Sequence, residues 1–229
     1  MKTLIIARHG NTFRPGETPT RVGAHTDLPL VEDARARGIG RYLLRLGLIP
    51  TRILAAPLQR TLRTAQLAAE ELHAPCTVTP DARFVEVDYG PDENKTEPEV
   101  MERLGRVACA AQGQDAAALS AEQLQELGAH AIELWNSHAV VPADWKVDVP
   151  AIIRNWHELA DEIHDGEILL CVSSNGTIRF APHITGDYSA FCAEHDIKVP
   201  TGGVCIFSCA DDGVWRCNEW GVKAFKKCD

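Results

Sequence analysis

The sequence predicts an α/β fold: a three-layer α/β/α sandwich with a mostly parallel central sheet and a helical cap inserted into it. Three observations support this prediction. Short apolar runs alternate along the chain with stretches whose apolar residues recur at helical spacing. Each apolar run has the length of a buried strand and is soon followed by glycine, proline or serine. Strands that alternate with helices imply a largely parallel sheet covered on both faces.

The apolar runs give the expected strands. The first covers residues 2–7 and stops at Arg8-His9-Gly10. Further strands are expected at residues 52–56, 76–79 and 167–172, followed by a terminal hairpin of residues 203–209 and 214–220 around Asp211-Asp212-Gly213.

Helices are expected where apolar residues recur at a spacing of three or four. These stretches are residues 28–48, 57–72, 97–111, 121–138 and 149–163, with a further helix over 177–184. Pro57 suits the first position of its helix. Residues 14–27 are rich in Pro, Gly, Thr and Asp and predict a loop. We interpret residues 1–229 as a single domain and residues 91–148 as its helical cap insertion.

Composition excludes some classes of function. The 229 residues are 45% apolar, which is enough for a substantial core, and the formal net charge is -9. A negative chain is a poor match for nucleic acid or for an anionic membrane surface. No apolar run approaches the roughly 18 residues of a membrane span, and the N-terminal run is too short for a secretory signal. We therefore expect a cytoplasmic protein.

The sequence has eight cysteines, and no two of them form a Cys-x-x-Cys pair. They are Cys76, Cys109, Cys171, Cys192, Cys205, Cys209, Cys217 and Cys228. Without a secretory signal we expect reduced, mostly buried thiols. A zinc site built from Cys205, Cys209 and Cys217 is the weaker alternative, so we predict no metal.

A cation and an imidazole stand where the first predicted strand ends. In open α/β sheets, ligands bind outside the carboxyl ends of the strands. Arg8 offers a planar fork of donors for phosphate oxygens. The neutral imidazole of His9 can act as a nucleophile, and Gly10 lets the backbone turn sharply. This pattern predicts phosphoryl chemistry.

Four segments in order resemble motifs of the histidine phosphatase superfamily, also called the phosphoglycerate mutase-like family. Residues 8–12 resemble Arg-His-Gly-x-Thr, and residues 56–65 resemble Ser-x-Leu-x-Arg-x-x-x-Thr-Ala. Residues 84–90 resemble Leu-x-Glu-x-x-x-Gly, and residues 172–179 resemble Val-Ser-His-Gly-Gly-x-Ile-Arg. Residues 23–30 also look like the family's Gly-x-x-Asp-x-Pro-Leu segment. Each motif alone is weak, but all of them in register predict the family.

The resemblance implies a role for each matching residue. His9 would attack phosphorus and become a phosphohistidine, while Arg8 and Arg60 would clamp the phosphoryl oxygens. Glu86 would protonate the leaving oxygen and then activate water, a role that needs a raised pKa. Asp88 is the second candidate for this acid. No cofactor is implied, because the arginines neutralise the phosphoryl charge.

The main departure lies in the fourth motif. Ser174 stands where the family has its second histidine, and Asn175 replaces the next glycine. Both can donate hydrogen bonds to a phosphoryl group, but neither brings charge; they could also cap the helix that follows. Three interpretations stay open. Neutral donors suffice, another residue (His25, His183 or Arg179) takes the place of the histidine, or the enzyme is weak or inactive.

Each of these residues also has an ordinary structural interpretation. Arg8 and His9 could be a structural pair, Arg60 a solvated helix residue and Glu86 a salt-bridge partner.

The function that we expect is a phosphomonoester phosphatase acting through His9 on a small phosphorylated substrate. One alternative is a phosphoglycerate-type mutase, although residues 91–100 contain a single basic residue. The other is a non-catalytic protein that binds a phosphorylated ligand.

Overall fold

The computed structural model describes residues 1–227 as two compact units. The sheet unit consists of Met1–Arg14, Asp27–Glu86 and the chain from Asp148 onward. The helical-hairpin unit consists of Pro15–Thr26 and Val87–Val147. The sheet unit contains the six principal residues of the candidate site, which are Arg8, His9, Arg60, Glu86, Ser174 and Asn175. Cys228 lies outside the described residues.

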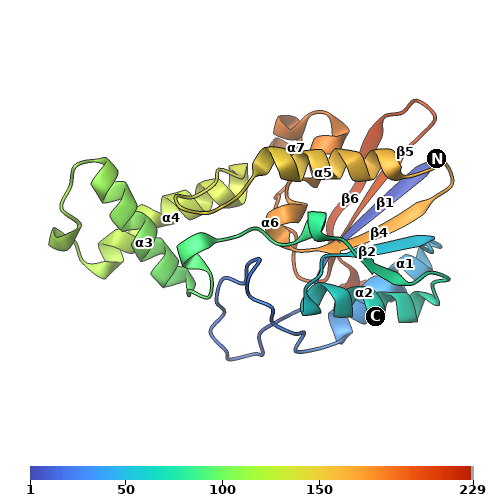
Figure 1. Ribbon diagram of the computed structural model, residues 1–229, viewed down its shortest axis with the longest axis horizontal. Helices are drawn as coiled ribbons and strands as arrows, with labels where there is room; N and C mark the ends of the chain where they lie inside the picture. The colour runs from blue at the N-terminus through green and yellow to red at the C-terminus, as the bar shows by residue number, and fades with distance from the viewer. Residues whose placement is uncertain (228–229) are drawn as a thin grey trace. The chain divides into compact units, whose positions relative to one another are not determined.

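A six-stranded mixed sheet forms the centre of the sheet unit, in the order β3-β2-β4-β1-β5-β6 (Figure 1). The strands are β1 (Lys2–Arg8), β2 (Arg52–Ala55), β3 (Val78–Pro80), β4 (Ile168–Ser173), β5 (Gly203–Cys209) and β6 (Trp215–Lys223). The first four in the sheet order run parallel to one another, whereas β5 and β6 are antiparallel to their neighbours. The predicted α/β fold with a mostly parallel sheet is confirmed.

Helices cover both faces of this sheet (Figure 1). Helices α1 (Ala34–Arg45) and α2 (Gln59–Leu72) lie on one face, and α5 (Val149–Glu162) lies on the other. Side chains alternate between the faces of a strand, so Ile5 and Ala7 of β1 share one buried cluster with residues of α1 and α2. Burial on both faces explains why β1 is apolar at successive positions.

Several element boundaries differ from the sequence prediction. The predicted helix 28–48 is limited to Ala34–Arg45, because the backbone N–H of Val31 donates to the distant carbonyl of Asn11 instead of to the carbonyl four residues earlier. The predicted helix 177–184 is instead α6 (Asn175–Ile178), followed by a 3-10 turn, and α7 (Tyr188–Glu194) was not predicted. The 3-10 turns are η1 (Ala82–Phe84), η2 (Gly90–Asp92), η3 (Ala116–Ala118), η4 (Ala181–Thr185) and η5 (Ala224–Lys226).

The helical-hairpin unit is built around α3 (Glu97–Ala111) and α4 (Ala121–His138), which keep the predicted bounds. The two helices cross closely at Gly105 and Gly128. A Cβ atom would lie 1.9 Å from a carbonyl oxygen of the facing helix at Gly105, and 1.8 Å from one at Gly128. Across the described residues, no helix is both long and apolar enough to span a bilayer.

A distant aspartate caps α2. Leu58 holds the N-cap position and has no side chain that can accept a hydrogen bond. Asp27 Oδ1 instead accepts from the backbone N–H of Gln59 at 2.7 Å, and Gln59 Nε2 donates to the Asp27 carbonyl at 3.1 Å. The helix therefore begins at Gln59 and not at Pro57, and Arg60 sits in its first turn.

We expect Asp27→Ala to lower the free energy of unfolding by about 1 kcal/mol, because a first-turn N–H of α2 loses its acceptor. Urea unfolding measures the change. Asp211→Ala, in the exposed β5–β6 turn, is the control and should stay within about 0.5 kcal/mol of wild type. Equal losses for the two variants would contradict the capping role.

Candidate active site

The carboxyl ends of β1 and β4 lie side by side at one edge of the sheet unit. The strands pair in parallel, with Arg8 opposite Ser173. The pairing continues one step beyond β1, where the His9 backbone N–H donates to the Ser173 carbonyl at 3.1 Å. The Arg-His-Gly segment and the Ser174-Asn175 segment are thereby brought next to each other, as expected from the parallel topology.

His9 is held in one tautomer and kept neutral. Its side chain is buried, with 6% of the residue exposed, and Nδ1 lies 2.7 Å from the Gly10 carbonyl oxygen. A carbonyl only accepts, so Nδ1 carries the proton and Nε2 keeps its lone pair. Burial, and then the positive charges of Arg8 and Arg60, hold the pKa of His9 well below the usual 6.5. The ring therefore presents an unprotonated Nε2 at neutral pH.

Two arginines supply the positive charge beside His9. Arg60 is fully buried in the first turn of α2, so its interpretation as a solvated helix residue is wrong. Arg8 is half-buried, and its Nη1 donates to the Val199 carbonyl at 2.6 Å. Thr64 Oγ1 accepts from the Gly10 backbone N–H at 3.1 Å and donates to the Arg60 carbonyl at 2.7 Å. One buried hydroxyl thus ties the His9 turn to the helix of Arg60.

Glu86 is buried, with 5% exposed, and its Oε2 accepts from the Gly176 backbone N–H at 3.3 Å. The carbonyls of the three preceding residues are each held by a side chain. The donors are Asn155 Nδ2 at 3.3 Å, Ser173 Oγ at 2.6 Å and Thr177 Oγ1 at 2.6 Å. These bonds place the Glu86 carboxylate beside the start of α6.

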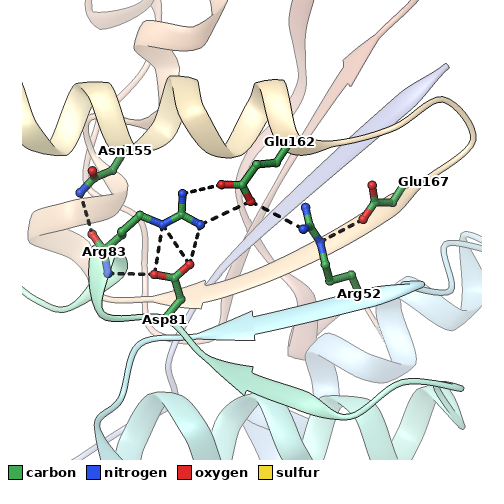
Figure 2. Close-up of polar contacts among 6 residues, drawn as sticks. All are labelled: Arg52, Asp81, Arg83, Asn155, Glu162 and Glu167. Carbon is green, nitrogen blue, oxygen red and sulfur yellow. Dashed lines mark hydrogen bonds and ion pairs between the residues drawn. The ribbon is translucent and has the colours of Figure 1, made fainter.

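A charged network anchors the segment that leads to Glu86 (Figure 2). Arg83 pairs with Asp81 at 2.7 Å and with Glu162 of α5 at 2.6 Å. Arg52 of β2 extends the network to Glu162 at 3.6 Å and to Glu167 at 3.0 Å. The groups are partly exposed, so each pair adds little stability by itself, and the effect of the network is to fix geometry.

The second candidate acid, Asp88, belongs to the helical-hairpin unit. Its carboxylate accepts from the Gly90 N–H at 2.7 Å and lies 3.2 Å from His25 Nε2 and 4.0 Å from Lys146 Nζ. Partial burial opposes ionisation, but these groups together hold the pKa of Asp88 below its usual value. A carboxylate stabilised in its charged form is poorly suited to donate a proton.

Ser174 and Asn175 have different surroundings. Ser174 is fully buried, and its hydroxyl makes no hydrogen bond to any described residue. It occupies the N-cap position of α6 without a side-chain capping bond, so the capping interpretation fails for Ser174. Asn175 is also buried, and its Oδ1 accepts from the Val199 backbone N–H at 2.8 Å. Sequence reasoning did not anticipate this bond.

The residues considered as substitutes for a second histidine have other contacts. His25 faces Asp88, as described above. The His183 ring stacks on Tyr188, with centroids 3.9 Å apart and planes inclined by 9°. Arg179 is fully buried, and its Nε donates to the Asn175 carbonyl at 3.4 Å. Of the three, Arg179 has a hydrogen bond to a residue of the candidate site.

Over residues 1–227, no group of three or more His, Cys, Asp or Glu side chains is arranged to hold a metal ion. Cys205 and Cys209 are buried on β5, and Cys217 is half-buried on β6. Burial raises the pKa of Cys217 to about 11 and holds the pKa of Cys205 well above its usual value, so both thiols are protonated at neutral pH. The cysteines that the structure describes are free thiols.

The model of the histidine phosphatase superfamily (branch 1) matches residues 4–223. The match spans nearly the whole sequence, so the chain belongs to this superfamily. No curated protein matches the chain significantly.

Solved structures with low sequence identity share the fold. Mycobacterial glucosyl-3-phosphoglycerate phosphatase, in complex with inorganic phosphate, has a TM-score of 0.66 and 16% identity, covering 98% of this chain and 99% of that one. A mutant (H9A) of phosphoserine phosphatase from Entamoeba histolytica, in complex with phosphoserine, has a TM-score of 0.67 and 16% identity, with coverage of 98% and 99%. YhfR from Bacillus stearothermophilus gives 0.68 and 18%, with coverage of 97% and 98%.

Proposed function

We propose that this chain is a phosphomonoester phosphatase that hydrolyses a small phosphorylated substrate through a phosphohistidine on His9. The observation that carries the proposal is the state of His9. Its Nδ1 is bound to the Gly10 carbonyl, and burial and two guanidinium charges hold the pKa of the His9 ring low. A buried neutral imidazole beside two arginines suits attack on a phosphoryl group.

In the first step, His9 Nε2 forms a bond to phosphorus while the bond from phosphorus to the leaving oxygen breaks. Glu86 gives its proton to that oxygen. Arg8 and Arg60 offset the negative charge of the transferring group, and the N-terminus of α2 adds to the positive field at Arg60. In the second step, water attacks phosphorus while the bond from phosphorus to His9 Nε2 breaks. Glu86 takes the proton of the water, and inorganic phosphate departs from the regenerated His9.

Glu86 is the better acid on two grounds. Its carboxylate lies beside the Ser174–Gly176 turn, in the same unit as His9. Asp88, in contrast, is stabilised as an anion by Gly90, His25 and Lys146.

Ser174 is the proposed neutral partner of the two arginines. Its buried hydroxyl makes no hydrogen bond within the described chain, and can donate to a phosphoryl oxygen. The Oδ1 of Asn175 accepts from the Val199 N–H, so the predicted direct contact of Asn175 with phosphate could be made by its amide nitrogen alone. Loss of one charged stabiliser typically costs about 10²–10³ in rate, so we expect a phosphatase of reduced activity.

The superfamily and the named phosphatases that share the fold support a small phosphomonoester as substrate. A second candidate is a non-catalytic protein that binds a phosphorylated ligand. It is favoured by the uncharged Ser174 at a position where a positive charge would aid turnover.

Hydrolysis of p-nitrophenyl phosphate distinguishes the two candidates. We expect turnover by the wild type, loss of turnover in His9→Ala, and a gain in Ser174→His, which restores a charged donor. His164→Ala, at an exposed position of the sheet unit, is the matched control and should retain activity. Undiminished activity in His9→Ala would refute the phosphatase proposal. A silent wild type that Ser174→His activates would favour the binding protein.

The pH dependence of kcat/KM reports the state of His9. Protonation of Nε2 removes the attacking lone pair, so activity falls as pH drops through the pKa of His9 in the folded protein. Because that pKa lies well below 6.5, the acidic limb should also lie well below pH 6.5. An acidic limb at or above pH 6.5 in a profile with p-nitrophenyl phosphate would contradict the assigned state.

Substitutions of the two carboxylates separate the candidate acids. We expect Glu86→Gln to lower kcat about 10²–10⁴-fold on an alkyl phosphate, because an alkoxide leaving group needs a proton. An initial burst of p-nitrophenol should survive, since that leaving group departs without one. Asp88→Asn, the matched control, should change both rates little. A large loss of kcat in Asp88→Asn with little change in Glu86→Gln would show that Asp88 is the general acid.

A further inference from the structure

The backbone of Val199 joins two parts of the candidate site. Its N–H donates to Asn175 Oδ1 at 2.8 Å, and its carbonyl accepts from Arg8 Nη1 at 2.6 Å. The Val199 side chain is fully buried, as is nearly all of Asn175. The two polar backbone groups of one loop residue are therefore bound by side chains from the first and the last sequence motif.

The loop that follows Val199 is attached to the first motif. Gly202 N–H donates to the carbonyls of Arg8 and His9, both at 3.1 Å. Thr201 Oγ1 donates to Asn11 Oδ1 at 2.8 Å. These bonds hold the Gly202 end of the loop, and the Asn175 side chain holds the Val199 end.

The bond to the Val199 carbonyl fixes one nitrogen of the Arg8 guanidinium group. A guanidinium group is planar and carries five N–H donors in a rigid fork. When Arg8 Nη1 is bound to a carbonyl, the direction of the plane depends on where that carbonyl lies. A shift of the Val199 peptide would turn the fork that recognises phosphoryl oxygens. The orientation of the Arg8 guanidinium plane therefore depends on the contacts that hold the Val199 backbone in place.

We infer that Asn175 is a positioning residue for Arg8, acting through the backbone of Val199. The inference rests on the proposed function, because it takes Arg8 as a phosphoryl ligand. The resemblance places a glycine at this position in related proteins, and a glycine has no side chain to make the bond. The departure at Ser174-Asn175 thus adds a tether on Arg8 beside the uncharged hydroxyl of Ser174.

A double-mutant cycle tests the inference with inorganic phosphate as the probe and calorimetry as the measurement. Asn175→Ala removes the tether. Arg8→Lys removes the planar fork but keeps a positive charge, so phosphate binding stays measurable. We expect each single variant to weaken phosphate binding about tenfold, and the double variant to bind within about twofold of Arg8→Lys alone.

The other roles of Asn175 give different results. If its amide nitrogen bound phosphate directly, the two losses would multiply in the double variant, and the inference would be overturned. If it served stability alone, Asn175→Ala would lower the melting temperature and leave phosphate affinity unchanged, which would also overturn it. Asn218→Ala, which removes the acceptor of the Ser208 hydroxyl on the β5–β6 hairpin, is the control and should keep wild-type affinity.

Two further measurements test the inference if the Asn175→Ala variant does not fold. Asn175→Gly replaces Asn175→Ala in the cycle if the alanine variant is unstable. In the wild type, NMR of the Arg8 guanidinium should show hindered rotation without phosphate present, and free rotation would contradict the tether. The double-mutant cycle measures phosphate affinity and does not require hydrolysis of a substrate. Failure of the proposed function therefore shows separately, as absence of hydrolysis in a wild type that still gives a coupled cycle.

Discussion

The parallel pairing of β1 with β4 is the constraint on which the candidate site depends. It sets Arg8 opposite Ser173 and carries His9 to the Ser174-Asn175 turn. The register brings Ile5 and Ala7 of β1 into the buried cluster with α1 and α2, and a slip by one residue would replace these side chains with those of the opposite face. Residues at opposite ends of the sequence thus form one site because two buried strands end together.

The electrostatics of the site serve two purposes at once. In the proposed mechanism, the charges of Arg8 and Arg60 attract a phosphoryl group, and burial followed by the same charges holds the pKa of His9 low. The Gly10 carbonyl then directs the proton of the ring to Nδ1 and leaves Nε2 for attack. In the proposed mechanism, the neutral hydroxyl of Ser174 completes this environment without a third cation. The site therefore depends on the placement of its two arginines, and the tether through Val199 acts on one of them.

Much of the fold and the main site residues could be predicted because their signals are local. The bounds of β5, α3 and α4 follow from apolar periodicity, and the motifs around His9 and Arg60 predict a phosphoryl-transfer role for these residues. The remaining features arise from contacts between distant segments. The Asp27 cap of α2, the Thr64 bridge and the Asn175–Val199 bond leave no periodic pattern in the sequence. The predicted start of α6, at residue 177, is two residues too late, because serine and asparagine are as typical of turns as of helix starts.

A covalent intermediate is the most direct test of the proposed chemistry. The purified protein is mixed with p-nitrophenyl phosphate, quenched in alkali to preserve phosphohistidine, and examined by intact-mass and peptide mass spectrometry. Our account predicts one phosphoryl group per chain, located on His9, with greater accumulation in Glu86→Gln because the attacking water is no longer activated. Steady release of p-nitrophenol without phosphorylated His9, or equal phosphorylation of His9→Ala, would contradict the account.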